Sequence, residues 1–344
     1  PWPRPFTGNP APTALTAAGQ SQRAIPWRKS EVEQMGEIKA ICISERRGTA
    51  KHPVETARLL EGYGIEGDAH GGNWHRQVSL LGLEKIEDFR KRGAEVEFGA
   101  FGENIVAEGI DFRRLPVGSW IGMGEAVLEL TQIGKECHTH CAIYHSVGDC
   151  IMPREGVFAR VLKGGIIRVG DRVEVLERET PFPWQAAVIT LSDKGAAGER
   201  KDESGPAIAA RLRENGYEVV ETILLADDRE RLENTLIRLA DQRQLDLILT
   251  TGGTGFSPRD ITPEATLAVA HRQAPGIAEA IRAASMNITP RAMLGRGVSV
   301  IRGKTLIINL PGSPKACQES MDVFLDTIPH AMGLLRGRVQ DCAR

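Results

Sequence analysis

Hydrophobic positions follow different patterns in the two halves of the chain. From about Gly36 to Leu176, short runs of apolar residues are separated by glycine-rich turns. Many short strands at close spacing favour a mostly β domain, either a barrel or a sandwich. The predicted strands include Ile38–Ile43, Val78–Leu81, Ala126–Ile133 and Arg172–Leu176, and one helix is predicted over Leu83–Lys91.

After Gln185 the apolar runs alternate with segments of helical periodicity. Strands are predicted at 187–191, 219–225, 245–249 and 305–310, and helices at 206–215, 229–241, 263–271 and 277–284. This alternation indicates a doubly wound α/β domain built on a mainly parallel sheet.

The two patterns, together with a length of 344 residues, predict two domains, because a single core rarely grows to that size. Residues 1–34 hold six prolines and no dense apolar stretch, so we predict a disordered leader. A linker is predicted where prolines interrupt the pattern. The predicted boundaries are 36–177 for the β domain, 178–185 for the linker, 186–336 for the α/β domain and 337–344 for a tail.

Composition and charge exclude several classes of function. The chain has a net charge of -2, with 20 basic and 20 acidic residues from Ala186 onward, so neither domain has the basic excess of a nucleic-acid binder. No apolar run approaches the ~20 residues that span a bilayer, and no signal-peptide core precedes the first domain. We therefore expect a cytoplasmic protein that acts on small molecules, with no nucleic-acid or membrane partner.

The segment from Asp246 to Asp260 holds the most informative turn. An apolar strand ends in three glycines within four residues, and a helix is predicted to begin at Thr262-Pro263 with a capping hydroxyl. Backbone N–H groups in such a turn can face an anion, and glycine permits close approach and positive φ. A tight turn without a ligand would need the same glycines.

Two further strands end in polar turns of the same kind. In an open parallel sheet such turns lie on one edge, where ligands bind. Lys315, at the start of the last turn's helix, is either a phosphate contact or a solvated lysine. The predicted binding residues are Ser192, Asp193, Gly252, Gly253, Thr254, Gly255, Pro311, Gly312, Ser313 and Lys315.

These turns also carry a family resemblance. The motifs are Ser192-Asp193, Ser204-Gly-Pro206, Thr251-Gly-Gly-Thr-Gly255, Pro258-Arg-Asp-Ile-Thr-Pro-Glu-Ala-Thr266 and Asn309-Leu-Pro-Gly-Ser-Pro314. In order and spacing they resemble the molybdopterin adenylyltransferase family over residues 186–336. The resemblance implies a trimeric domain that transfers AMP from ATP to the terminal phosphate of molybdopterin with Mg²⁺.

Two aspartates that are essential in that family correspond to Asp227 and Asp260. This chain has Ala226 where the family has proline, and the neighbouring Asp228 leaves the first assignment ambiguous. Carboxylates suit Mg²⁺, which takes only one or two protein ligands, so both are predicted as catalytic residues and metal ligands. The alternative role for Asp260 is to cap the following helix, and the two roles are compatible.

Motifs in the first half resemble the MOSC domain, named for the C-terminal part of molybdenum cofactor sulfurases. They are Gly64-Ile-Glu-Gly-Asp-Ala-His-Gly71, Phe98-Gly-Ala-Phe-Gly-Glu-Asn104, Gly134-Lys-Glu-Cys137 and Gly156-Val-Phe-Ala-Arg-Val-Leu162, within residues 36–176. The resemblance implies a β-rich barrel that binds molybdenum cofactor or its pterin, with Cys137 at the position of a sulfur-carrying cysteine. Further candidates are Arg154 and Arg160 for a pterin phosphate, and His70 and His75 for the pocket wall.

Three interpretations remain open for the sequence Cys137-His-Thr-His-Cys141. It could bind zinc, form a buried structural cluster, or supply a reactive thiol whose thiolate is favoured by His138 or Lys135. We favour the reactive thiol, with Cys141 or Cys150 as a resolving partner.

Both resemblances point to molybdenum cofactor biosynthesis. The expected activity is Mg-ATP-dependent adenylylation of molybdopterin, joined to cofactor binding or sulfur transfer by the first domain. Expected partners are molybdoenzymes or a cysteine desulfurase, and a homotrimer is expected through the C-terminal domain. The alternatives are a non-catalytic carrier that delivers cofactor to apoenzymes, or a protein whose main activity is sulfur transfer through Cys137.

Overall fold

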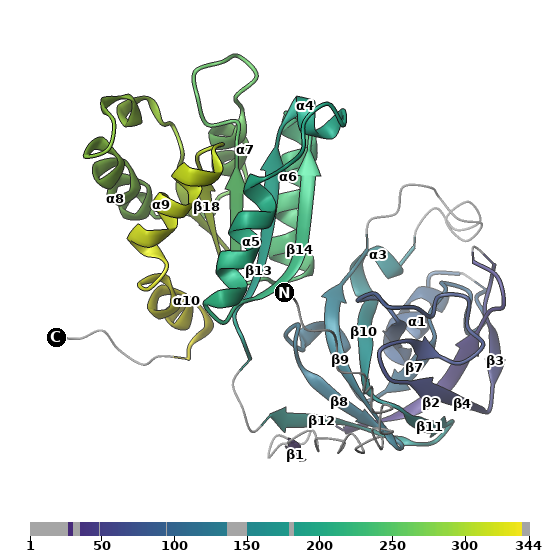
Figure 1. The fold of residues 1–344 in the computed structure, drawn as a ribbon. Helices are drawn as coiled ribbons and strands as arrows, with labels where there is room; N and C mark the ends of the chain where they lie inside the picture. The colour runs from purple at the N-terminus through teal and green to yellow at the C-terminus, as the bar shows by residue number, and fades with distance from the viewer. Residues whose placement is uncertain are drawn as a thin grey trace, which may run out of the picture.

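A closed β-barrel and an α/β domain make up the chain in the computed structural model (Figure 1). The structure describes residues 27–29, 35–47, 49–93, 95–135, 150–178 and 182–338. Among these residues, none of the helices combines the length and the apolar character that a membrane span requires.

Seven strands close the barrel. Around the ring they run β12-β8-β9-β10-β6-β7-β2, and β12 pairs with β2 to complete it. Neighbours are antiparallel except β6 and β7, which are parallel. Closure removes the free sheet edges, and it decides between the two architectures that the pattern allowed. The strands are β2 (Met35–Ile43), β6 (Val78–Gly82), β7 (Ile105–Glu108), β8 (Trp120–Met123), β9 (Ala126–Ile133), β10 (Val157–Lys163) and β12 (Arg172–Arg178).

Smaller elements surround the ring. Strand β1 (Trp27–Lys29), which falls within the predicted leader, pairs with β12. Strand β3 (His52–Val54) extends β2, and a separate sheet joins β11 (Gly165–Arg168), β4 (Thr56–Leu60) and β5 (Gly64–Ile65). The helical segments here are α1 (Leu83–Arg90), η1 (Phe112–Arg114) and α3 (Met152–Glu155).

Apolar side chains fill the barrel and support it from outside. Ile38, Leu80 and Leu128 belong to the main buried cluster. A second cluster lies under α1, where the rings of Phe89 and Phe101 meet edge to face at 5.1 Å between centroids.

The second domain is built on a six-stranded sheet in the order β14-β13-β15-β18-β17-β16. The first four strands are parallel, and β17 and β16 are antiparallel additions at one edge. The strands are β13 (Gln185–Leu191), β14 (Glu218–Leu225), β15 (Leu247–Thr251), β16 (Arg272–Gln273), β17 (Ser299–Arg302) and β18 (Thr305–Leu310).

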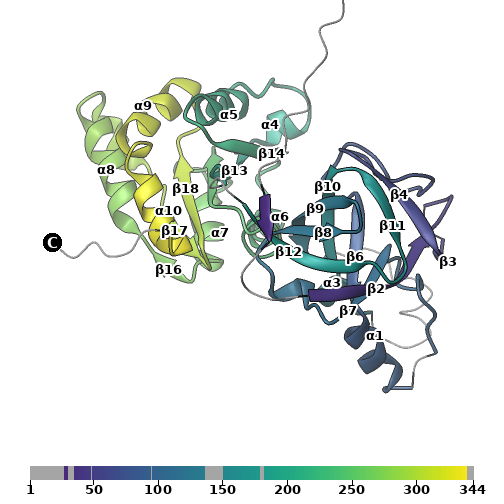
Figure 2. The same ribbon diagram turned by 90° about the horizontal axis from the view of Figure 1, so that it is seen from below.

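Helices cover both faces of this sheet (Figure 2). One buried cluster joins the strands to α5 (Ser204–Glu214), α8 (Pro275–Met286), α9 (Pro314–Phe324) and α10 (Ile328–Arg336). A second cluster, on the opposite face, joins them to α6 (Arg229–Ile237), η2 (Arg238–Gln242) and α7 (Thr262–Ala268). Two short segments, α4 (Asp193–Ala196) and η3 (Pro290–Leu294), complete the domain. The predicted doubly wound α/β architecture is confirmed.

The start of α7 differs from the sequence prediction. Thr262 is helical, and its hydroxyl donates to the Gly252 carbonyl at 2.9 Å instead of capping the helix. The Asp260 carboxylate accepts from the Ser257 N–H at 2.8 Å, so it does not cap α7 either. Both side chains therefore form hydrogen bonds with the turn that precedes α7, in place of the helix cap that the sequence predicted.

Polar contacts join the two domains. The Val117 N–H donates to Gln244 Oε1 at 3.2 Å, and Arg160 Nη2 lies 3.6 Å from Glu218 Oε1. Gln244 has a left-handed backbone, with φ of 48°, which is uncommon for a residue other than glycine.

A buried ion pair supports the region of the Gly-Asp-Ala-His motif in the barrel. Lys51 Nζ lies 2.7 Å from Asp68 Oδ2, and the two side chains are 1% and 0% exposed. The Asn104 amide donates to Asp68 Oδ2 at 2.9 Å, and the Ser44 N–H donates to Oδ1 at 3.1 Å. Burial alone would raise the pKa of Asp68, but the adjacent His70 and hydrogen bonds from Lys51 and Asn104 lower it below its ordinary value.

We predict that Asp68→Asn destabilises the barrel by about 3–5 kcal/mol, because it leaves the Lys51 ammonium buried without its counter-ion. The measurement is the free energy of unfolding from denaturant titration. Since the Asp68 pKa is depressed, its stabilising contribution is present above the unfolded-state pKa and is lost as the pH falls through the acid range. The variant should therefore depend less on pH. Asp88→Asn, at a solvent-exposed pair with Lys91, is the control and should change stability little.

Candidate functional site

Four turns meet at the carboxyl edge of the parallel strands. Strand pairing places Leu191 beside Leu225, and Thr251 lies beside both Thr190 and Leu310. The three turns singled out in the sequence therefore lie together, with the Ala226-Asp227 turn after β14 as a fourth. This edge is where doubly wound folds bind ligands.

Glycine is required where these turns touch. Gly252 and Gly253 have φ of 93° and 62°, and a β-carbon on Gly252 would overlap the Leu191 carbonyl oxygen. A β-carbon on Gly253 would overlap the Thr262 hydroxyl and lie 3.1 Å from Asp227 Oδ1. A β-carbon on Gly312 would lie 3.5 Å from the Gly252 Cα. The backbones of these turns therefore lie so close together that side chains do not fit between them at these positions.

Reciprocal hydrogen bonds join the turns after β13 and β14. The Asp193 N–H donates to Asp227 Oδ2 at 3.1 Å, and the Asp227 N–H donates to Asp193 Oδ1 at 3.0 Å. Arg259 clamps Asp193 with two hydrogen bonds, of 3.0 and 2.7 Å. Asp193 therefore positions Asp227, which sequence reasoning did not anticipate.

The structure distinguishes Asp227 from its neighbour. Asp228 is the N-cap of α6 and accepts from the Arg231 N–H at 3.0 Å. Asp227 Oδ1 is buried and receives no hydrogen bond from the described residues. Burial raises the pKa of Asp227, and the charges of Asp193 and Asp260 raise it further. A cation beside this carboxylate would relieve both penalties.

Asp260 lies on the other side of the glycine turn. A β-carbon on Gly255 would lie 2.9 Å from Asp260 Oδ2. Arg296 donates to the carbonyls of Gly255 and Asp260, at 2.6 and 2.5 Å, and pairs with Glu264. No local signal could have identified Arg296, because it is more than 30 residues from each partner.

The two carboxylates fit the Mg²⁺ that the family resemblance implies. Asp227 presents a buried oxygen without a donor, and the charge of Asp260 contributes to the negative field that raises the pKa of Asp227. Mg²⁺ is held by one or two carboxylates and completes its shell with water and phosphate oxygens. Among the described residues no group of three or more acidic, histidine or cysteine side chains is placed to hold a metal.

A polar hollow of about 340 Å³ adjoins the turns. Ser192 and Ser313 line it, and each caps a helix, accepting from the Gly195 and Ala316 N–H groups at 3.0 and 3.2 Å. The other polar residues around it include Arg200, Lys201, Asp202, Glu203 and Ser204. Arg200, Lys201 and the hydroxyls can face an oxygen-rich anion here, while the Asp202 carboxylate already accepts from the Gly205 N–H at the start of α5.

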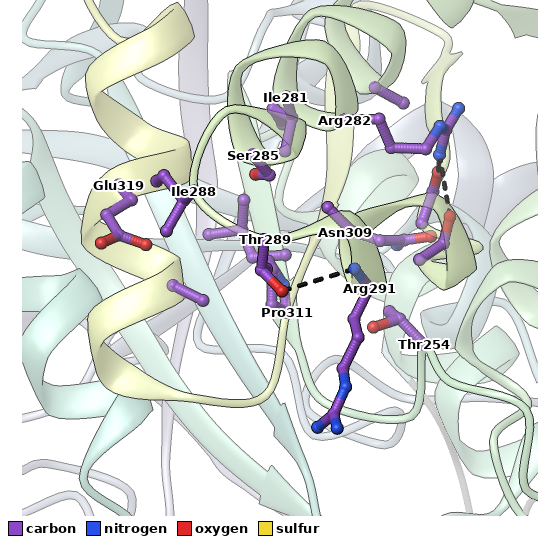
Figure 3. A pocket seen from close by; sticks show the side chains of 16 residues that line it. Thr254, Ile281, Arg282, Ser285, Ile288, Thr289, Arg291, Asn309, Pro311 and Glu319 are labelled. Carbon is purple, nitrogen blue, oxygen red and sulfur yellow. Dashed lines mark hydrogen bonds between the residues drawn. The ribbon is translucent and has the colours of Figure 1, made fainter.

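A mostly apolar hollow of about 260 Å³ lies on the other side of the same turns (Figure 3). Thr254 and Pro311 line the end nearest the turns. Ile281, Ile288 and Leu310 form much of its wall, while Arg282 is held by the Gly297 carbonyl at 2.8 Å. Its composition suits a flat ring with a few polar groups.

Three predicted binding residues lie away from these two hollows. The Lys315 side chain is 85% exposed and lies 3.7 Å from Glu319 on the same helix, so the alternative of a solvated lysine describes its position. Arg160 pairs with Glu129 and faces Glu218 of the other domain, at the junction between the domains. Arg154 lines none of the hollows described here and lies on α3.

Cys137, His138 and Cys141 fall outside the described residues, and Cys150 is buried. Burial raises the pKa of the Cys42 thiol to about 12. His70 Nδ1 lies 3.6 Å from Asp68 Oδ1. His75 instead hydrogen-bonds Gln132 at 2.9 Å, near the end of β9, the strand that precedes Cys137 in the sequence. The two histidines therefore have separate environments.

Two protein-family models match the chain. A model described as a probable molybdopterin binding domain matches residues 187–330, and the MOSC domain model matches residues 66–174. The two matches do not overlap, and each falls within one of the two domains.

Curated proteins match the C-terminal half. The molybdopterin adenylyltransferase of Helicobacter pylori is 41% identical over 152 residues, which cover 44% of this chain and 86% of that protein. The Escherichia coli K12 molybdopterin adenylyltransferase is 38% identical over 165 residues, covering 44% and 84%. Among solved structures, the molybdopterin biosynthesis enzyme MoaB of Thermus thermophilus shares 45% identity, covering 45% of this chain and 97% of that one, with a TM-score of 0.43.

Proposed function

The chain belongs to the molybdopterin adenylyltransferase family through its C-terminal domain and carries a MOSC domain before it, and from this we propose that it adenylylates molybdopterin in molybdenum cofactor biosynthesis. The observation that carries the proposal is Asp227. Its buried oxygen without a donor lies beside Gly253 of the glycine turn and in the field of Asp260, at the carboxyl edge of the parallel strands.

In the proposed reaction, the terminal phosphate oxygen of molybdopterin attacks the α-phosphorus of ATP. A P–O bond forms there, the bond between the α-phosphorus and the bridging oxygen breaks, and pyrophosphate leaves with that oxygen's electron pair. Negative charge grows on the non-bridging oxygens, so fixed N–H donors and cations supply most of the rate enhancement. Backbone N–H groups of the glycine turns are rigid enough for this role, since their packing allows little movement.

The two hollows divide the binding of the reactants. The polar hollow, with its hydroxyls and the cations of Arg200 and Lys201, receives phosphate groups, and the apolar hollow receives a ring. Asp227 and Asp260 would hold Mg²⁺ between them and the phosphates, and the ion would neutralise charge on the phosphate oxygens. Asp193 keeps Asp227 in place through two hydrogen bonds.

A non-catalytic carrier of pterin or finished cofactor is the rival function. A carrier would need binding groups but no mutually repelling carboxylates around a partly buried Asp227. The raised pKa of Asp227, caused by burial and then by nearby negative charge, favours the enzyme, since perturbed carboxylates gather at catalytic centres.

For the barrel we propose binding of molybdenum cofactor or its pterin, with Cys137 carrying sulfur. The Cys137 thiolate would attack the outer sulfur of a cysteine desulfurase persulfide, so that the donor's S–S bond breaks and its thiolate leaves. A molybdoenzyme would receive the sulfur.

Asp260→Asn and Asp227→Asn should each reduce adenylyl transfer about 100-fold or more. Each substitution removes a negative charge that would hold the Mg²⁺ beside the reacting phosphates. Formation of adenylyl-molybdopterin from ATP and molybdopterin is measured directly. Asp228→Asn is the matched control: it alters a helix cap one residue away and should keep most of the activity. Wild-type turnover in both Asp227 and Asp260 variants would contradict the assignment.

Cys137 should react faster with an alkylating agent than Cys42 or Cys317. Those two thiols are buried, and burial raises the pKa of both, whereas a sulfur carrier must be an accessible thiolate. Mass-spectrometric mapping with and without a chelator makes the comparison. Cys137→Ser should abolish persulfide formation and leave adenylyl transfer intact. One equivalent of metal that protects Cys137 and Cys141 together would instead support the zinc interpretation.

The protein should be a homotrimer through its C-terminal domain. Supporting this, several large apolar side chains of that domain are exposed, including Phe256, Ile288, Met293 and Leu294, at 70%, 58%, 62% and 50%. Light scattering should give about three times the chain mass of 37.5 kDa. A monomer at micromolar concentration would contradict the proposal.

A further inference from the structure

The loop of residues 252–261, which carries Asp260, has little apolar packing of its own. It connects β15 to α7, and its residues 256–259 are exposed. The side chain of Phe256 is 70% exposed, so burial does not fix the backbone there. Segments with few buried apolar contacts open at low free energy. The proposed catalytic carboxylate therefore needs other contacts to stay in one position.

Arg296 supplies three such contacts from a distant segment. Its Nε donates to the Gly255 carbonyl at 2.6 Å, and its Nη2 donates to the Asp260 carbonyl at 2.5 Å. Its Nη1 pairs with Glu264 in the first turn of α7. The guanidinium thus holds the loop at two points and also holds the start of the next helix. A planar fork of donors allows this, because the compact ammonium of a lysine cannot serve acceptors in three fixed directions.

Another charged contact of the loop is more exposed. Arg259 pairs with Asp193, and their side chains are 63% and 45% exposed, whereas the Arg296 side chain is 29% exposed. Water screens exposed ion pairs, which contribute little to stability. The Ser257 N–H orients the Asp260 carboxylate, but Ser257 moves with the loop. Among the described residues, Arg296 therefore makes the main side-chain contact that fixes the loop.

Other groups hold the backbone on which Arg296 lies. The Arg296 N–H donates to the Thr254 carbonyl at 3.1 Å. Arg282, which lines the apolar hollow, donates to the Gly295 and Gly297 carbonyls at 3.2 and 2.8 Å (Figure 3). Removal of the Arg296 guanidinium should therefore release the loop and leave the wall of the hollow in place.

We propose that Arg296 is a positioning residue for adenylyl transfer, which holds Asp260 at the metal site without touching the reactants. The inference rests on the proposed function and assigns separate roles to two arginines: Arg282 shapes the hollow that binds a ring, and Arg296 sets the position of the metal-binding carboxylate. Without Arg296 the loop would move among positions in which Asp260 cannot hold Mg²⁺, so the reaction step would suffer. Loss of Arg282 would instead affect binding of the ring.

The first test compares the steady-state kinetics of Arg296→Met and Arg282→Met in the full chain. For Arg296→Met we expect kcat at saturating Mg-ATP to fall about 30-fold or more, while KM for molybdopterin stays within about threefold of the wild-type value. For Arg282→Met we expect KM for molybdopterin or for ATP to rise about tenfold, with kcat within about threefold. Arg296→Lys keeps the charge without the fork and should recover only part of the lost kcat. Equal losses of kcat in the two methionine variants would contradict the separate roles.

The second test measures metal binding without turnover. The probe is the Mn²⁺ complex of α,β-methylene-ATP, an analogue in which a carbon bridge prevents release of pyrophosphate. Arg296→Met and Asp260→Asn should each weaken its binding about tenfold, and the double variant should bind no more weakly than Asp260→Asn alone. Such non-additivity is expected where Arg296 acts through Asp260, whereas a general loss of structure would give additive effects.

Arg302→Met is the matched control. Arg302 is also a partly buried arginine, 15% exposed, which pairs with Asp241 and donates to the Val269 carbonyl at 2.8 Å. It lies beside Thr305, at the opposite edge of the sheet from the glycine turns. The variant should retain wild-type kcat and probe binding, whatever loss of stability thermal unfolding shows.

Four outcomes would overturn the proposal: no probe binding by the wild type, unchanged probe binding by Arg296→Met, additive effects in the double variant, or an equal loss in Arg302→Met. A wild-type protein that binds the probe but does not transfer AMP would contradict the proposed function instead. The role of Arg296 in holding Asp260 would then be decided by the binding test alone.

Discussion

The proposed active site depends on the close approach of backbone turns at one edge of a parallel sheet. Gly252 and Gly253 adopt positive φ and leave no room for a β-carbon, because the Leu191 carbonyl and the Thr262 hydroxyl occupy that space. A packed arrangement of this kind fixes N–H groups and carboxylates before any ligand arrives, so little reorganisation is needed during reaction. The doubly wound sheet that carries the turns is a common architecture. The proposed adenylyl transfer depends instead on the close packing of the turns.

Electrostatics within the site reinforces this geometry. Arg259 neutralises Asp193, and Asp193 in turn orients Asp227 through the backbone. Asp227 is left with a buried oxygen and a raised pKa, caused first by burial and then by neighbouring carboxylates. An arrangement of partly compensated negative charge is unfavourable for the free protein and favourable once a cation and phosphates bind, which is characteristic of functional sites rather than of structural ion pairs.

The barrel shows the contrasting use of charge. Lys51 and Asp68 are almost completely buried, and hydrogen bonds from Asn104 and Ser44 satisfy the carboxylate. Such a pair is costly to break but need not stabilise more than an apolar replacement would. Its effect here is to hold the segment that precedes His70 and Trp74. Through Trp74 this segment reaches the junction between the domains.

Sequence alone determined the two-domain plan, most of the strands and helices, and the turns that meet at the sheet edge. These depend on local periodicity and glycine placement, and parallel strands necessarily bring their carboxyl ends to one edge. The order and spacing of the sequence motifs also indicated the family to which the C-terminal domain belongs. Only the tertiary structure closed the barrel, separated Asp227 from the helix cap Asp228 and placed Arg296 across the glycine turn. Apart from the local cap at Asp228, these features depend on residues far apart in the chain, whose contacts no local pattern encodes.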